Sequence, residues 1–87
     1  MDWSHSPKQV DGIEVNSVAD GYIVYQSDRD RVHYLNPTAV LVLEMCNGRV
    51  RAGEIPGLLK DAYDLAEPPT TEVDECLTKL LDEGLVE

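Results

Sequence analysis

A change of hydrophobic period at Asn36-Pro37 restricts the fold of this chain more than any other feature. Before this point, residues 13–18 have a short, mixed pattern, residues 22–25 are β-branched and aromatic, and residues 31–35 alternate between two faces, as β-strands do. Turn-forming residues separate the three segments. The pattern predicts a meander of three antiparallel strands before residue 36.

After Asn36-Pro37 the apolar residues recur with helical spacing. Asparagine is a strong N-cap, and proline is favoured at the first helical position, where its missing N–H costs nothing. A first helix is therefore expected over residues 38–46, and because it is apolar nearly all round it should be buried. A second, amphipathic helix is expected over about residues 54–63.

A third helix is expected after a two-proline break. Thr70 or Thr71 can cap it, and Thr71 with Asp74 has the spacing of a capping box. Gly84 ends the helix, and residues 85–86 are expected to form a short extended segment against the sheet. Together these elements predict an α+β, winged-helix-like domain, with a three-stranded antiparallel sheet followed by three helices in the order β-β-β-α-α-α.

Length and composition restrict the classes of function. A chain of 87 residues holds one small domain, expected over residues 13–87 behind a flexible tail of residues 1–12. The formal charge of -10 repels phosphate backbones and anionic lipid headgroups, which argues against nucleic-acid and membrane partners. The sequence has no basic-then-apolar leader, no apolar run of membrane length and no disulfide pattern. The expected compartment is the cytoplasm.

Few residues have the spacing of a catalytic or metal site. His5 falls in the expected tail and His33 in the third strand, and neither has a nucleophile at a motif spacing. Cys46 and Cys76 stand in apolar helical patterns, where a free thiol usually packs as a small hydrophobe. No four-ligand zinc spacing and no glycine-rich phosphate loop occurs in the sequence. We therefore expect a non-catalytic protein without a cofactor or a metal.

The residues favour a groove between the third strand and the third helix. An outer strand of a meander carries unpaired N–H and C=O groups that can pair with an added peptide strand; a wing or a helix that covers this edge is the alternative. On the third helix, polar residues spaced by three and four run beside an apolar stripe, and acidic residues also stabilise a helix N-terminus without any binding role. The predicted peptide-binding residues are Arg31, Val32, His33, Tyr34, Leu35, Glu72, Val73, Glu75, Cys76, Lys79, Leu80 and Glu83.

Two segments carry a resemblance to a known family. Residues 34–43 (YLNPTAVLVL), followed by residues 46–49 (CNGR), look like that family's Leu-Asn helix start and its "cDG" helix end, with Asn47 in place of Asp. Residues 73–86 (VDECLTKLLDEGLV) are similar to its C-terminal apolar pattern, which ends in Gly-Leu-Val, with Glu72 where that pattern has Asp. From about residue 21 to residue 86 the sequence resembles the PqqD-like domains, the precursor-peptide recognition elements of ribosomal peptide modification pathways.

The resemblance implies a fold, a function and a partner. Members of this family fold as three strands followed by three helices, and they bind a leader peptide as an added strand beside the third strand, packed against the third helix. They are not catalysts, and they present the precursor to a modifying enzyme or a leader peptidase. The Asn-Pro-Thr helix start at residues 36–38 most resembles the free-standing leader-binding proteins of lasso-peptide pathways.

Three other functions stay open at this point. A PqqD-type chaperone for a radical-enzyme pathway, such as quinone cofactor biosynthesis, would use the same fold. A winged-helix DNA-binding regulator would rest on the fold and on Arg49 and Arg51, and the acidic third helix argues against it. The third is a subunit that supports a partner enzyme without binding a leader.

Overall fold

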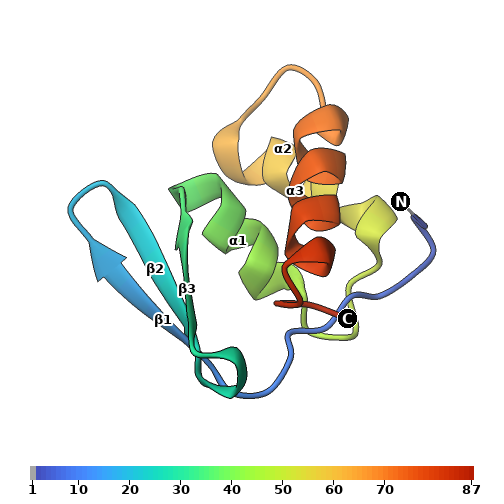
Figure 1. Cartoon of the computed structure of the whole chain (residues 1–87). Coiled ribbons are helices and arrows are strands. Elements are labelled where there is room, and N and C mark those ends of the chain that lie inside the picture. Colours follow the sequence, from blue (N-terminus) through green and yellow to red (C-terminus); the bar gives the residue numbers. More distant parts are fainter. Residues whose placement is uncertain (1) are drawn as a thin grey trace.

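The protein folds as a small antiparallel sheet beside three helices (Figure 1). The structure is a computed structural model that describes residues 2–87, without the side chain of Asp28. The strands β1 (Ile13–Val18), β2 (Gly21–Gln26) and β3 (Arg31–Leu35) precede the helices α1 (Pro37–Met45), α2 (Ile55–Tyr63) and α3 (Thr70–Asp82). The predicted α+β order of three strands and then three helices is confirmed.

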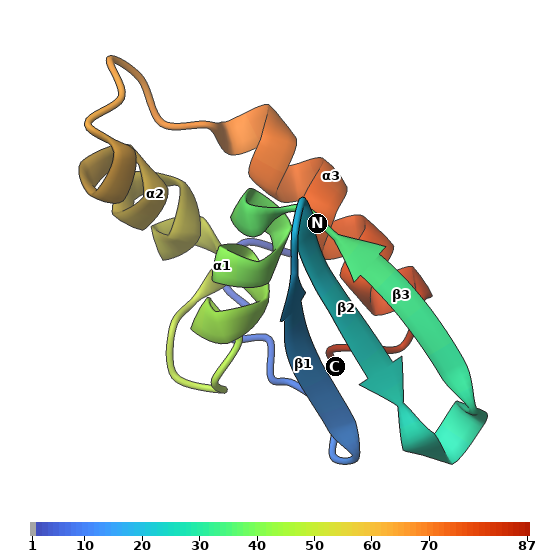
Figure 2. The ribbon, with the colours of Figure 1, turned by 90° about the vertical axis from the view of Figure 1, so that its left-hand side faces the viewer.

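The sheet has the order β1-β2-β3, so β3 lies at an edge (Figure 2). Opposite residues of β2 and β3 share a face, with Tyr22 opposite Leu35 and Tyr25 opposite Val32. Leu35 is buried on the inner face, whereas Val32 and Tyr34 lie on the outer face, where 63% and 57% of their surface is exposed. The alternation read from residues 31–35 therefore holds, and it points the side chain of Leu35 into the core.

Helix α1 begins where the sequence predicts. The side-chain oxygen of Asn36 accepts a hydrogen bond of 2.8 Å from the main-chain N–H of Ala39, and Pro37 is the first helical residue. A single residue, Asn36, therefore separates the end of β3 from the helix, which places the first turn of the helix beside the edge strand. Asn36 thus fixes the corner between the sheet and the helices.

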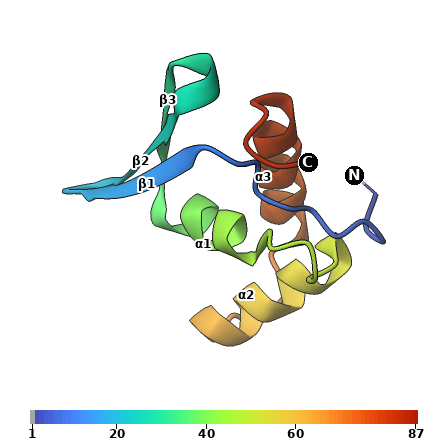
Figure 3. The same cartoon turned by 90° about the horizontal axis from the view of Figure 1, so that it is seen from below.

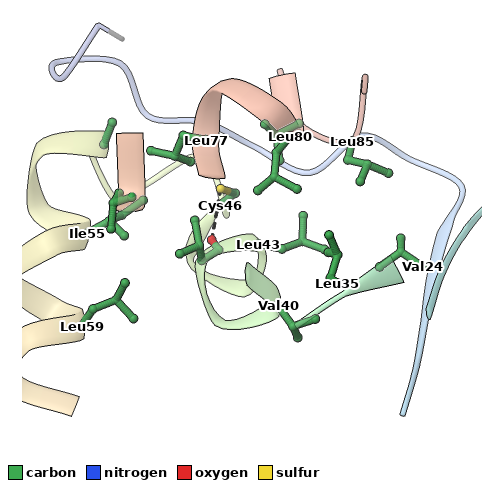
Figure 4. Close-up of a cluster of buried hydrophobic side chains, with 14 residues drawn as sticks. Val24, Leu35, Val40, Leu43, Cys46, Ile55, Leu59, Leu77, Leu80 and Leu85 are labelled. Carbon is green, nitrogen blue, oxygen red and sulfur yellow. Dashed lines mark hydrogen bonds between the residues drawn. The ribbon is translucent and has the colours of Figure 1, made fainter. Parts of the chain in front are cut away.

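The core gathers apolar side chains around α1 (Figure 4). Val24 and Leu35 reach it from the sheet, Leu43 from α1 and Ile55 from α2, and each is buried. Helix α3 adds three further buried residues, Val73, Leu77 and Leu80. Burial of one such side chain contributes about 1.5 to 3 kcal/mol, so α3 is held in place by the same core that supports the sheet.

The segment before β1 differs from the flexible tail expected for residues 1–12. The main chain of residues 3–10, here named the strap, is hydrogen-bonded to the helical part of the molecule and to the C-terminal residues. Lys8 and Glu87 exchange two main-chain hydrogen bonds of 2.9 and 2.8 Å, and Pro7 is fully buried. In Figure 3 the strap passes beside the C-terminal residues. Met1, which belongs to the same expectation, lies outside the described residues.

Two expectations near α3 are wrong in detail. The main chain of residues 85–86 pairs with the strap rather than with the sheet, because Val86 forms its β-bridge with Gln9, while the side chain of Leu85 is buried in the core beside β3. The N-cap of α3 is Pro69 and, among the described residues, no side chain makes the capping hydrogen bond, so neither Thr70 nor Thr71 is the cap that a capping box requires. The carbonyl of Pro69 instead accepts the first-turn hydrogen bond, from the N–H of Val73 at 3.0 Å. Main-chain bonding replaces the side-chain cap that the sequence suggests.

Candidate peptide-binding site

Two adjoining hollows open between β3 and α3. The first, of about 350 Å³, is lined by all five residues of β3 together with Lys79, Leu80, Glu83 and Leu85, and we name it the charged hollow. The second, of about 470 Å³, reaches from Tyr34 and Leu35 across α1 to the first half of α3, and we name it the apolar hollow. Lys79 and Leu80 line both hollows, so the two form one groove. All twelve residues predicted from the sequence line this groove.

The main chain of β3 offers hydrogen-bonding groups to the groove. A Cβ atom placed on Gly21 would lie 2.8 Å from the carbonyl oxygen of Leu35, so this oxygen points toward β2. In an antiparallel ladder, successive residues turn their N–H and C=O groups to opposite sides of the strand. The main-chain groups of Val32 and Tyr34 therefore point away from β2, toward the open edge. An extended peptide could pair with them there.

The apolar hollow has an apolar floor and a charged rim. Buried side chains from β3 and the three helices line its floor: Leu35, Val42, Leu59, Val73 and Leu80. Glu72, Glu75 and Lys79 of α3 line it as well, and all three are exposed. A hollow of this kind suits a large apolar side chain that enters between charged neighbours.

Two cysteines lie at or beneath the apolar hollow. Cys76 is half-buried and lines it, and burial raises the pKa of its thiol, with a smaller opposing effect of Lys79. Cys46 is fully buried, and burial, together with the nearby Cys76, raises the pKa of its thiol to about 12. Both thiols are therefore protonated at neutral pH. A nucleophilic cysteine would need the thiolate, whereas a protonated thiol suits packing in the core.

A polar network closes the other end of the groove. The buried side chain of Gln26 donates to the carbonyl of Gly84 at 3.1 Å and accepts from Nε2 of His33 at 3.3 Å. Nδ1 of His33 lies 3.4 Å from a carboxylate oxygen of Glu83, and the guanidinium of Arg31 lies 3.8 Å from the same oxygen. The network joins β2 and β3 to the end of α3 and so fixes the spacing between the two walls of the charged hollow.

The sequence did not predict some residues of the site, one in the adjoining polar network and two in the groove itself. Gln26 alternates with the buried Val24 on the inner face of β2, and this period of two was the signal that could have placed it beside His33. Thr38 and Ala39 line the apolar hollow from the first turn of α1. Their place follows from the corner at Asn36, which brings that turn next to β3.

Other candidate chemistry is scattered over the molecule. His5 lies on the strap, with Nε2 3.2 Å from the carbonyl oxygen of Glu87, far along the chain from His33. Among residues 2–87, no group of three histidine, cysteine or carboxylate side chains is placed to hold a metal ion. None of the helices described here is long and apolar enough to cross a membrane. A further hollow of about 480 Å³ lies between α1, α2 and the start of α3, but unlike the groove it is not lined by the open edge of β3.

Comparisons with known proteins agree with this geometry. A solved structure described as "Lasso peptide synthetase B1 complexed with the leader peptide" is similar in fold, with a TM-score of 0.70 and 15% sequence identity, over 94% of this chain and 98% of that one. No curated protein matches the sequence. The family model described as "Coenzyme PQQ synthesis protein D (PqqD)" matches residues 21–86. This match confirms the resemblance seen in the sequence, and because it spans well over half of the chain, the protein belongs to the PqqD family.

Proposed function

We propose that the protein binds the leader region of a ribosomally made precursor peptide and delivers it to a modifying enzyme or a leader peptidase. The observation that carries this proposal is the open edge of β3, which lies directly beside the apolar hollow in a member of the PqqD family. The leader would add as a fourth strand along β3 and place side chains against α3. The protein of similar fold whose description names a lasso peptide synthetase and a leader peptide supports a lasso-peptide pathway.

Affinity would come from two sources of different strength. Pairing with the outward main-chain groups of Val32 and Tyr34 would hold a peptide of almost any sequence in extended form. An apolar anchor that fills the hollow beside Val73 and Leu80 would add about 1.5 to 3 kcal/mol. Each exposed ion pair on the rim would add less than about 1 kcal/mol. Apolar anchors would therefore dominate the binding free energy.

The protein would act in the cytoplasm, where precursor peptides are made, and without catalysing a reaction. The apolar hollow has no activated nucleophile, since the thiol of Cys76 is held protonated by burial. The bond-making steps would belong to a separate enzyme that receives the captured leader. The DNA-binding alternative is not favoured, because α3 presents Glu72, Glu75 and Glu83 against the single Lys79.

The test is a fluorescence-anisotropy titration of the purified protein with labelled leader peptides encoded beside its gene, with a scrambled leader as the control. Two variants at one position examine the edge directly. Val32→Pro removes an outward N–H without removing a bond to β2, as proline on an edge strand can. Val32→Thr keeps the N–H and a β-branched side chain of similar size.

We expect saturable binding to one leader and none to its scramble. Because Val32→Pro removes an edge donor and restricts the strand, it should weaken binding at least about tenfold, roughly the value of one or two hydrogen bonds. Val32→Thr should bind as the unmodified protein does, and circular dichroism should show both variants folded. Equal binding by folded Val32→Pro and Val32→Thr would contradict strand addition at β3, and no binding to any leader would contradict the proposed function itself.

A further inference from the structure

The charged side chains of the groove are ordered along its length. Helix α3 and strand β3 run in opposite directions past each other, because Arg31 at the start of β3 lies 3.8 Å from Glu83 beyond the end of α3. The end of β3, at Leu35, shares the apolar hollow with Glu72 in the first turn of α3. The groove therefore has one end near Arg31 and another near Glu72.

The two ends differ in charge, because the described residues at one end carry only carboxylates whereas the other end pairs Arg31 with Glu83. Arg31, Lys79 and His33 line the charged hollow, where Glu83 is the one acidic residue of the lining. Glu72 and Glu75 line the other end, and Lys79 lies between the ends, in both hollows. Among the described residues, Lys79 forms no ion pair, whereas Glu83 is already within 4 Å of Arg31 and His33. A ligand carboxylate near Lys79 would thus meet a cation that is not already ion-paired, although Glu75 and Glu83 flank it four residues away on either side.

The position of these charges along the groove matters more than their number. The described lining holds two fixed cations, Arg31 and Lys79, and its two carboxylates that are not ion-paired, Glu72 and Glu75, lie together at one end. Charges at a rim contribute little to affinity, but they fix the register of a partner and penalise wrong arrangements. An edge strand needs such a device, because its main chain accepts an added strand in either direction and in several registers.

We propose that this charge order selects the direction and register of the bound peptide. The inference rests on the proposed function. An antiparallel pair is the more stable form of ladder, and in that form the N-terminal end of the peptide lies beside Leu35, Glu72 and Glu75, while its C-terminal end lies beside Arg31. The groove then selects, from N- to C-terminus, a basic residue, an apolar anchor and an acidic residue. Because β3 spans about four residue spacings, the basic position and an acidic position near Lys79 or Arg31 lie up to about four residues apart.

A structural role for the same carboxylates makes a different prediction. Acidic residues near the N-terminus of α3 stabilise the helix through its dipole, and in that case their exchange would lower stability without changing which peptides bind. The deciding readout is therefore the preference between two peptides, which a purely structural effect would leave unchanged.

The experiment starts with a random library of 12-residue peptides, displayed on their encoding RNA and selected on the immobilised protein. A parallel selection on the Val32→Pro variant gives the background, because this variant lacks the outward N–H of β3 with which an added strand would pair. From the enriched sequence we would synthesise a pair of peptides that differ only by exchange of the basic and the acidic residue, and titrate both by anisotropy. The protein variants are Glu72→Lys with Glu75→Lys and, as the matched control, Glu44→Lys with Asp61→Lys. Glu44 and Asp61 are exposed and line neither hollow.

Each double variant removes two negative charges and adds two positive charges, so both change the formal charge from -10 to -6 and differ only in where the charge is placed. We expect the unmodified protein and the control to prefer the basic-first peptide by about fivefold, the value of two exposed ion pairs. The groove variant should lose or reverse this preference. An unchanged preference in the groove variant, or enriched peptides without any charge order, would overturn the inference while strand addition stands. No enrichment above Val32→Pro would instead overturn the proposed function.

Discussion

At the scale of single residues, the buried thiol of Cys46 couples stability to pH. Its sulfur lies 3.2 Å from the carbonyl oxygen of Val42, to which the thiol donates, and the side chain is fully buried. Burial, and to a lesser extent Cys76, raises its pKa from 9.0 to about 12. The unfolded chain therefore ionises this thiol at a lower pH than the folded protein does. The resulting stabilisation is complete below pH 9 and is lost as the pH rises toward 12.

We expect this coupling to appear as a loss of stability in mildly alkaline solution. With these two pKa values the free energy of unfolding should fall by about 1.4 kcal/mol between neutral pH and pH 10. The measurement is urea unfolding at pH 7.5, 9 and 10 with a reductant present. Cys46→Ala is the control. It should be less stable than the unmodified protein at pH 7.5, because it leaves a small cavity. The difference in free energy of unfolding between the two proteins should be about 1.4 kcal/mol smaller at pH 10. A difference in free energy of unfolding that stays constant across this pH range would contradict the coupling of stability to the Cys46 thiol.

At the scale of elements, the strap joins the end of α1, the segment before α2 and the C-terminal residues. It bonds to the end of α1 through Gln9, whose side chain donates to the carbonyl of Leu43 at 2.9 Å. It bonds to the segment before α2 through Trp3 and His5, whose carbonyls accept from Gly53 and Ala52 at 2.9 and 2.8 Å. These contacts make the strap part of the cooperative fold rather than an appendage.

The single tryptophan reports on this segment. Trp3 packs against the core and is partly buried, so its fluorescence should change in the same transition as the far-ultraviolet circular dichroism during urea unfolding. Gln9→Ala removes one partly buried hydrogen bond and should lower both midpoints together, by about 1 kcal/mol in free energy. If the fluorescence changed at clearly lower urea than the circular dichroism, the strap would be detaching on its own.

The strap also shows where reading the sequence fails. The strand-to-helix change at Asn36-Pro37 could be predicted because side chains specify it: an amide that caps and a ring that fits the first helical turn. The groove could be predicted because Tyr34 and Leu35 alternate on β3 and Val73 and Leu80 repeat on α3. The strap is held mostly by main-chain groups, which every residue carries, so its composition gives no sign of its contacts.

At the scale of the whole molecule, net charge opposes the self-association that open edges invite. Strands β1 and β3 both lie at edges of the sheet, and β3 presents the exposed Val32 and Tyr34 on the outer face next to its unpaired main chain. Such an edge can pair with a copy of itself. At neutral pH the formal charge of -10 makes each approaching copy repel the other. This repulsion vanishes as the pH falls toward the sequence pI of about 4.4.

We therefore expect a monomer at pH 7.5 and growing self-association as the pH is lowered toward 5. Sedimentation velocity at both pH values measures the change, with circular dichroism to show that the protein stays folded. Adding salt at pH 7.5 screens the same repulsion and should shift the equilibrium in the same direction, by a smaller amount. Val32→Pro blocks the edge donor on β3 without changing the charge, so it should stay monomeric under conditions in which Val32→Thr associates. Equal association of the two variants at pH 5 would place the contact on another surface, and the open edge of β3 would then be available to peptides alone.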